Sequence, residues 1–400
     1  MNKQTIKYLV SALAMIALSY TSFAQTTWKG TWATAVEYTG KGDMPKESLS
    51  NRSCRQIVHV SLGGQELRLK LSNEFSQEPV QILSVYIADT DAERNWSIDG
   101  KSVRYLKFGG KKNITIAAGK TVYSDVLKYH LKAGQRLTIT IDYGKQTPVN
   151  ATSHRGSRTT SYIMSQVNGK PVKPIVDFHQ QEQVDHWYNL SAIDVKTDEK
   201  TPIVAILGNS ITDGRGSTTN LQNRWTDFLS EALNTEKPYG VLNLGIGGNC
   251  VVEGGLSEPA MKRFERDILG QTGVDKLIIF EGTNDIGGSS KNYEHVADTL
   301  IACYQVLIAK AKAKGIKVYG ATITPNKGHG WYSIWHEAVR QTVNEWIRTS
   351  GAFDAIVDFD ELVRDPQDEQ RLKPEYSDDW LHLNPKGYEA MGKFAAEKLR

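Results

Sequence analysis

From Pro202 to the C-terminus, apolar runs alternate with amphipathic stretches, and this alternation limits the possible folds most strongly. The apolar segments 202–209, 239–246 and 274–282 each precede a stretch with helical periodicity. Such alternation is typical of βαβ units, in which helices cover both faces of a parallel sheet. Right-handed crossovers place the carboxyl ends of the strands along one edge, where α/β proteins bind ligands. We therefore expect residues 201–400 to form an α/β domain with its site at that edge.

The same pattern gives the remaining elements of this half of the chain. Further strands are expected at 316–325 and 355–360, and helices at 224–233, 260–269, 295–315, 334–351 and 385–399.

Residues 25–200 show strand patterns and no convincing helix. Short runs with alternating or β-branched apolar residues are separated by Gly, Asn and Asp, at 55–64, 65–73, 80–89, 102–110, 112–119 and 136–144. Many short strands with regular turn signals indicate an all-β sandwich or jelly roll. The stretch 145–200 is less regular and ends in a strand over 186–195. This domain could bind sugar, shape the site or only stabilise the fold.

The N-terminal residues 1–24 have the features of a secretory signal peptide. Lys3 and Lys7 precede the short apolar segment 8–20, and small residues lead to a cleavage site after Ala24. A membrane anchor is the alternative, but the segment is shorter than the roughly 20 residues that span a bilayer. We expect a soluble, secreted or periplasmic protein without stable membrane insertion.

Charge and cysteine content exclude several other classes. The net charge of +3 is too small to favour nucleic acid or an anionic membrane as partner. The three cysteines, Cys54, Cys250 and Cys303, fit no zinc spacing. The segment 208–217 lacks the Lys-Ser/Thr ending of a phosphate loop, and the glycines at 245–248 lack the full dinucleotide fingerprint, so we expect no cofactor. Cys303 lies in a helical pattern and is expected in the core. The sequence does not decide whether Cys54 and Cys250 form a disulfide. The oligomeric state is not determined by the sequence.

Small, polar and ionisable residues follow the expected strands where an α/β fold builds its site. The first strand ends at Gly208, Asn209 and Ser210, and the second ends in the glycine-rich segment 243–249. The third ends in "EGTND" at 281–285, and "DDWLHLNPKGY" at 378–388 leads into the last helix.

These residue types match the requirements of acyl transfer. A serine such as Ser210 becomes a nucleophile when a base, here His382, removes its proton. Asp379, three residues before His382, can orient the imidazole, although the neighbouring Asp378 is an alternative. A glycine amide after the second strand and the Asn284 side chain can donate to the oxyanion.

In this order, the four blocks resemble the SGNH hydrolases, also called GDSL esterases, over roughly residues 202–400. The resemblance implies a flavodoxin-like three-layer α/β/α domain, hydrolysis of an ester and no metal. It assigns the nucleophile to Ser210 and the remaining triad to Asp379 and His382. It assigns the oxyanion hole to Ser210, Gly248 and Asn284, with Gly245 or Gly247 as the alternative to Gly248. The family commonly has Asp where this chain has Asn209, which weakens the motif but not the chemistry.

Other polar and aromatic residues are candidates for the walls of the site. Asp213 is expected to shape the loop after Ser210 rather than take part in chemistry. Candidate substrate contacts are His154, Arg158, Arg215, Asn249, His329 and Trp331.

The sequence thus predicts an exported serine esterase that works through an acyl-enzyme. Polar, Gly-rich site loops favour a short acyl group, because long-chain lipases need a wide apolar cleft. By analogy with secreted SGNH members, the substrate is an O-acetylated carbohydrate or a small ester. A broader lipase or arylesterase, an acyltransferase, and a carbohydrate-binding protein with an inactive hydrolase domain are the alternatives.

Overall fold

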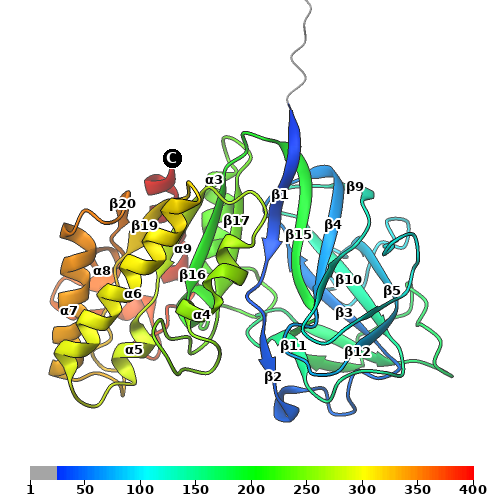
Figure 1. Ribbon diagram of the computed structural model, residues 1–400, viewed down its shortest axis with the longest axis horizontal. Helices are drawn as coiled ribbons and strands as arrows, with labels where there is room; N and C mark the ends of the chain where they lie inside the picture. The colour runs from blue at the N-terminus through cyan, green and yellow to red at the C-terminus, as the bar shows by residue number, and fades with distance from the viewer. Residues whose placement is uncertain (1–24) are drawn as a thin grey trace, which may run out of the picture.

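The computed structural model describes residues 25–400. The expected signal peptide, residues 1–24, lies outside the described residues. Figure 1 shows two parts side by side. We call residues 25–200 the antiparallel half and residues 201–400 the parallel half. The division of the chain into separate folding domains at this point stays a prediction.

A parallel sheet forms the centre of the parallel half. Its strands lie in the order β17-β16-β18-β19-β20, with all neighbouring pairs parallel. In chain order they are β16 (Ile203–Gly208), β17 (Gly240–Gly245), β18 (Lys276–Phe280), β19 (Lys317–Ala321) and β20 (Ala355–Val357). The order 2-1-3-4-5 is that of flavodoxin-like sheets, in which a ligand binds where the strand order reverses. The expected α/β fold is therefore confirmed.

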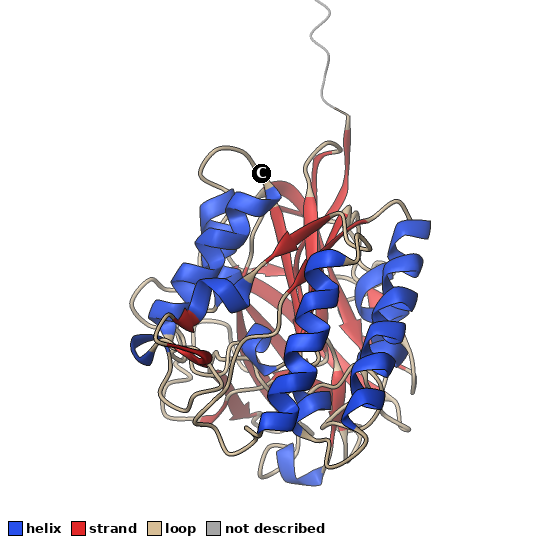
Figure 2. Ribbon diagram, turned by 90° about the vertical axis from the view of Figure 1, so that its left-hand side faces the viewer, coloured by secondary structure: helices blue, strands red, loops and turns tan. Residues whose placement is uncertain are grey.

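Helices cover both faces of this sheet (Figure 2). One face packs on α4 (Ala260–Phe264), α6 (Tyr293–Ala313) and α7 (Ile334–Thr349). The other packs on α3 (Trp225–Leu233), α8 (Phe359–Val363) and α9 (Pro385–Leu399). Shorter elements are α2 (Ser210–Asp213), α5 (Thr283–Gly287), the π-helical turn η2 (Glu265–Leu269), the 3₁₀ turn η3 (Pro374–Tyr376), β21 (Arg364–Asp365) and β22 (Asp368–Leu372).

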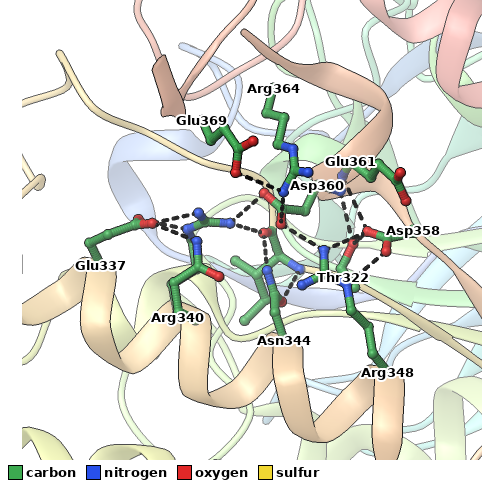
Figure 3. Close-up of polar contacts among 12 residues, drawn as sticks. Thr322, Glu337, Arg340, Asn344, Arg348, Asp358, Asp360, Glu361, Arg364 and Glu369 are labelled. Atoms are coloured by element: carbon green, nitrogen blue, oxygen red, sulfur yellow. Dashed lines mark hydrogen bonds and ion pairs between the residues drawn. The ribbon is translucent and has the colours of Figure 1, made fainter. Parts of the chain in front are cut away.

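A network of ion pairs connects α7 to the segment that follows β20 (Figure 3). The fully buried Asp360 accepts hydrogen bonds from Arg340 and Arg348, each at 2.7 Å. Arg348 also donates to Asp358 at 2.7 Å, and the Thr322 hydroxyl donates to Asp358 at 2.8 Å. Because the carboxylate of Asp360 has two cationic partners, its charge is compensated inside the protein.

The antiparallel half consists of strand pairs that are all antiparallel. One sheet contains β1 (Thr26–Ala33), β15 (Leu190–Asp198), β4 (Gly64–Ser72), β8 (Thr121–Tyr123) and β9 (Leu127–Leu131). A second contains β13 (Glu182–Val184), β12 (Ser161–Ser165), β3 (Arg52–His59), β10 (Arg136–Tyr143), β5 (Val80–Asp89), β6 (Arg104–Tyr105) and β7 (Ile114–Ile116). A third contains β14 (Trp187–Tyr188), β11 (Ala151–His154) and β2 (Glu37–Thr39), and a 3₁₀ turn, η1, spans Lys41–Asp43.

The two larger sheets share an apolar core, as expected of a sandwich. Alternate residues of β10, namely Leu137, Ile139 and Ile141, pack in the same cluster as Leu67 and Leu69 of β4. The expected strand-rich fold is thus confirmed. The expected strand at 102–110 is wrong beyond β6, because Gly109 and Gly110 adopt positive φ values of 58° and 81° in a turn.

The two halves meet where the edge strands β1 and β17 lie side by side (Figure 1). The Gly30 amide of β1 donates to the Thr272 carbonyl at 2.9 Å, and the Val241 amide of β17 donates to the Ser61 hydroxyl at 3.0 Å. A Cβ on Gly240 would lie 2.9 Å from the Gly30 carbonyl oxygen, so this approach requires glycine. One apolar cluster continues from the sandwich to the parallel sheet across this contact.

All three cysteines are free thiols, so the Cys54–Cys250 disulfide is not formed. Cys303 is half-buried at the edge of the core rather than inside it. None of the helices in residues 25–400 has both the length and the apolar character that crossing a membrane requires.

Candidate active site

Ser210 is the first residue of the single-turn helix α2, two positions after the end of the strand β16. Asn209 caps this turn, because its side-chain oxygen accepts a hydrogen bond from the Ile211 amide at 3.1 Å. A Cβ on Gly208 would lie 2.1 Å from the Thr212 hydroxyl, so the tight turn needs glycine there. Asn209 thus supplies the cap that an Asp would also supply, and the unusual residue leaves the turn intact.

His382 reaches Ser210 from the loop before α9, although the two residues are 172 positions apart. The Ser210 hydroxyl lies 2.9 Å from Nε2 of His382, and Nδ1 of His382 lies 2.7 Å from Oδ2 of Asp379. A carboxylate only accepts, so Nδ1 carries the hydrogen and Nε2 is free to accept from Ser210. The structure therefore brings Ser210, His382 and Asp379 into one chain of hydrogen bonds.

Asp379, and not the alternative Asp378, is the carboxylate at His382. Its other oxygen accepts from the amides of Leu381 and His382 at 3.0 and 2.8 Å. Burial raises the pKa of Asp379, but the hydrogen bonds from His382 outweigh burial and lower the pKa to about 2. Burial lowers the pKa of His382 below its ordinary value, and Asp379 offsets only part of this effect. At neutral pH the pair is therefore a carboxylate with a neutral imidazole.

Hydrogen-bond donors for an oxyanion gather near Ser210. Among residues 25–400, no acceptor is found for the backbone amides of Ser210 and Gly248. The Asn284 side-chain amide donates one hydrogen to the Asn249 carbonyl at 2.8 Å, which leaves its second hydrogen available. Gly248 has a φ of 70°, and a Cβ there would lie 2.7 Å from Leu256, so this position also needs glycine.

A buried guanidinium, which the sequence analysis did not identify, connects the strand ends behind these donors. Arg263 of α4 has no exposed surface and donates to the carbonyls of Gly208 and Leu244 at 3.2 and 2.8 Å. Its Nε donates to Oδ1 of Asn249 at 2.9 Å. Arg263 therefore ties β16 to β17 and to the segment after Gly248. A possible signal was an arginine on the apolar face of the helical pattern at 260–269.

Glu281 is a second buried ionisable side chain that the sequence analysis did not single out. It has no exposed surface, and its Oε1 lies 3.5 Å from Nη2 of Arg263. Neither carboxyl oxygen has a hydrogen-bond partner among the described residues. Burial raises the pKa of Glu281 to about 8, although the charge of Arg263 lowers it.

Ser210 and His382 line a cleft of about 570 Å³ between the two halves. Ser210, Gly248, Asn284 and His382 line it from the parallel half, together with Leu256. The antiparallel half supplies the opposite wall, formed by Glu37, Asp43, Arg155, Gly156, Arg158 and His186. The site is therefore built by both halves of the chain.

Four of the six expected substrate contacts line this cleft: Arg158, Arg215, His329 and Trp331. The expectations for His154 and Asn249 are wrong. His154 is 3% exposed and is bonded to the Ala35 carbonyl and to Asp213, so it has no surface for a substrate. Asn249 has no exposed surface, because its side chain bonds Arg263 and the Glu258 carbonyl.

Within residues 25–400, no group of three or more His, Cys, Asp or Glu side chains is arranged to hold a metal ion.

Comparisons with known proteins agree with this fold. Residues 206–390 match the model of the GDSL-like Lipase/Acylhydrolase family, so this part of the chain is a domain of that family. It is thus a domain of ester-hydrolysing enzymes.

Solved structures and curated proteins were compared as well. A GDSL-like lipase from Bacteroides thetaiotaomicron is 22% identical, covers 50% of this chain and 90% of its own, with a TM-score of 0.38. A carbohydrate acetylesterase family member from Sinorhizobium meliloti is 14% identical, covers 50% of this chain and 98% of its own, with a TM-score of 0.40. Among curated proteins, nothing matches.

Proposed function

We propose that this protein is a serine esterase in which Ser210 is the nucleophile, His382 the general base and Asp379 the residue that orients His382. The observation that carries the proposal is the continuous chain of hydrogen bonds, 2.9 Å from Ser210 to His382 and 2.7 Å from His382 to Asp379. A neutral imidazole whose Nε2 accepts from a serine hydroxyl is the arrangement that activates this nucleophile.

The reaction proceeds in two steps. In the first, His382 Nε2 takes the Ser210 proton as Oγ attacks the ester carbonyl, and the imidazolium then protonates the leaving alcohol. In the second, His382 takes a proton from water, the hydroxide attacks the acyl-enzyme, and Ser210 recovers its proton. Asp379 stabilises the imidazolium in both steps but keeps its own charge, consistent with its low pKa.

The negative charge that forms on the carbonyl oxygen is bound by the amides of Ser210 and Gly248 and by the Asn284 side chain. The free amides and the fixed orientation of Asn284 support this role, because preorganised donors need no rearrangement during the reaction. Replacing Asn284 by Ala is expected to lower kcat by about 10²- to 10³-fold with little change in KM.

The substrate that best fits the cleft is a short O-acyl ester, acetyl above all, of a carbohydrate. The wall opposite Ser210 carries the carboxylate of Asp43 and two guanidiniums, Arg155 and Arg158. These charged groups can bind hydroxyl groups of a sugar but would not bind a long alkyl chain. The volume of about 570 Å³ exceeds the space that an acetyl group alone requires. The apolar segment near the N-terminus supports export of the enzyme.

The first experiment compares hydrolysis of p-nitrophenyl acetate and p-nitrophenyl octanoate by the wild type and by Ser210→Ala. We expect turnover of acetate that is lost in the variant, and a preference for acetate over octanoate. Equal turnover by both proteins would contradict the assignment of Ser210, and a preference for octanoate would favour a lipase. Transfer of acetyl to an added sugar in place of water would favour an acyltransferase. A wild type that binds acetylated oligosaccharide but never cleaves it would favour the carbohydrate-binding alternative.

A further inference from the structure

Asp213 connects the helical turn that carries Ser210 to the antiparallel half. It is the last residue of α2, and its amide donates to the Asn209 carbonyl at 2.8 Å, which closes the turn around Ser210. Its side chain is 2% exposed and points to the segment after β11 rather than to the hydrogen-bonded chain of His382. The position of this turn therefore depends on what holds the Asp213 carboxylate.

Two cationic side chains of the antiparallel half hold that carboxylate. Nε2 of His154 lies 2.8 Å from Oδ1 of Asp213, and Nη2 of Arg158 lies 2.5 Å from Oδ2. A Cβ on Gly156, between these two residues, would lie 2.1 Å from the same Oδ2. Glycine at this position is thus required for the close approach of the two halves.

The hydrogen bonds of His154 require the charged imidazolium. Its Nδ1 lies 2.9 Å from the Ala35 carbonyl and its Nε2 faces the Asp213 carboxylate, and both of these partners only accept. Both ring nitrogens must therefore carry a hydrogen. Burial lowers the pKa of His154, but the hydrogen bond and charge of Asp213 outweigh burial and raise the pKa above its ordinary value.

The remaining charges around this contact are compatible with an imidazolium. Glu37 of β2 raises the pKa of His154, whereas the positive charge of Arg158 lies on the other Asp213 oxygen. Arg224 of α3 lowers the pKa of Asp213 from the side of the parallel half. His186 lies near His154, and its own pKa is lowered, mainly by burial, so it stays neutral. Trp187 stacks on the His154 ring.

We propose that His154 and Arg158 are positioning residues for Ser210, acting through Asp213, so that the antiparallel half is a working part of the esterase. The inference rests on the proposed function of Ser210 and assigns a role to residues 25–200. A shift of the Ser210 turn by a fraction of an ångström would lengthen the 2.9 Å contact with His382 on which proton removal depends.

The test compares His154→Gln with His59→Gln, a matched control. His59 also lies at the junction of the halves, 3.4 Å from Asp227 of α3, but it has no contact with the Ser210 turn. Both variants are assayed with p-nitrophenyl acetate and for the rate at which a fluorophosphonate labels Ser210. His154→Gln is expected to lower kcat and the labelling rate about tenfold or more, with KM within about twofold of wild type. His59→Gln is expected to leave both rates unchanged.

The pH profile distinguishes positioning from general structural support. Wild-type kcat should decline at alkaline pH as His154 loses its proton, and the decline should be absent in His154→Gln. Arg158→Gln, whose side chain is 27% exposed, serves as a second variant if His154→Gln does not fold, and it should slow labelling as well. Labelling of either variant at the wild-type rate would overturn the inference, as would an equal loss in His59→Gln. If the wild type is labelled but does not hydrolyse p-nitrophenyl acetate, the proposed substrate class is wrong and the positioning role still stands. If the wild type is not labelled, both the assignment of Ser210 as nucleophile and the positioning role are wrong.

Discussion

Arg263 and Glu281 face each other at 3.5 Å without any exposed surface, directly behind the strand ends that carry Ser210 and Asn284. Arg263 satisfies carbonyls on two strands, whereas both oxygens of Glu281 lack a hydrogen-bond partner among the described residues. The interior of this enzyme thus contains a carboxyl group that favours its protonated form near neutral pH.

The stability of the protein should therefore depend on pH through Glu281. The pKa of Glu281 is raised from 4.5 to about 8 in the folded protein. Its contribution to the free energy of unfolding is therefore complete below pH 4.5, the pKa in the unfolded chain, and is lost as the pH rises through about 8. The free energy of unfolding of Glu281→Gln, relative to that of the wild type, should increase by at least about 1 kcal/mol from about pH 5 to about pH 9. Denaturant unfolding at both pH values measures this difference. Glu389→Gln, which changes an exposed carboxylate paired with Lys393, is the control and should show no such gain.

The acid side of the activity profile should reflect His382. Its pKa is lowered from 6.5 by burial, and catalysis needs the neutral ring, so kcat/KM should rise with pH and reach half its maximum below about pH 6.5. Steady-state rates of p-nitrophenyl acetate hydrolysis across this range give the midpoint. A midpoint clearly above this value would show that another group controls the step.

Asp379 and Asp378 give a matched pair of variants. Asp379→Asn replaces the carboxylate at Nδ1 of His382 by an amide, whose NH₂ group favours the other tautomer of the ring, and should lower kcat by about 10²- to 10⁴-fold. Asp378→Asn changes an exposed neighbour and should retain wild-type kcat. The two rates with p-nitrophenyl acetate decide between them, and a larger loss in Asp378→Asn would reverse the assignment.

Trp331 should contribute to binding of the sugar rather than to chemistry. It lines the cleft and packs close to Gly287, just after Asn284, and 39% of its surface is exposed. Trp331→Ala should raise KM for an acetylated oligosaccharide by about tenfold and leave p-nitrophenyl acetate turnover nearly unchanged. Trp335→Ala removes a more exposed tryptophan, which stacks on Tyr293 outside the cleft, and should change neither parameter. Equal effects of the two variants would exclude a specific contact.

The network of Figure 3 should contribute to stability without affecting catalysis. Asp360→Asn removes counter-charge from the buried Arg340 and from Arg348, whose side chain is 24% exposed, and should cost about 3 kcal/mol of unfolding free energy. Glu361→Gln, at the exposed neighbouring residue, should cost little. Thermal unfolding measures both, and the kcat of the folded Asp360→Asn protein should equal that of wild type.

The sequence predicted the elements whose signals are local. The helical periodicity at 334–351 and 385–399 corresponds to α7 and α9 because each helix buries one continuous apolar face. The polar blocks after the strands led to Ser210, Asn284 and His382, since parallel strands bring their carboxyl ends to one edge. The structure places these three residues in the same cleft.

The features that the sequence did not predict depend on contacts between distant segments. His154 was expected to contact the substrate, but its imidazole pairs with the carboxylate of Asp213 on the other half, 59 positions later. Arg263 was not singled out, because only the fold shows that α4 directs it behind the strand ends. The short strands β8 and β9 were missed because they exist only through their pairing with β4.

The junction of β1 with β17 also covers two sheet edges. Both strands lie at the edge of their sheets, and an uncovered edge presents free amides and carbonyls to any neighbouring chain. Here each edge shields the other, with Gly30 and Gly240 permitting the contact. Bulkier residues at either glycine would separate the edges and leave two templates for strand addition, so the residues that join the halves also cover the two sheet edges.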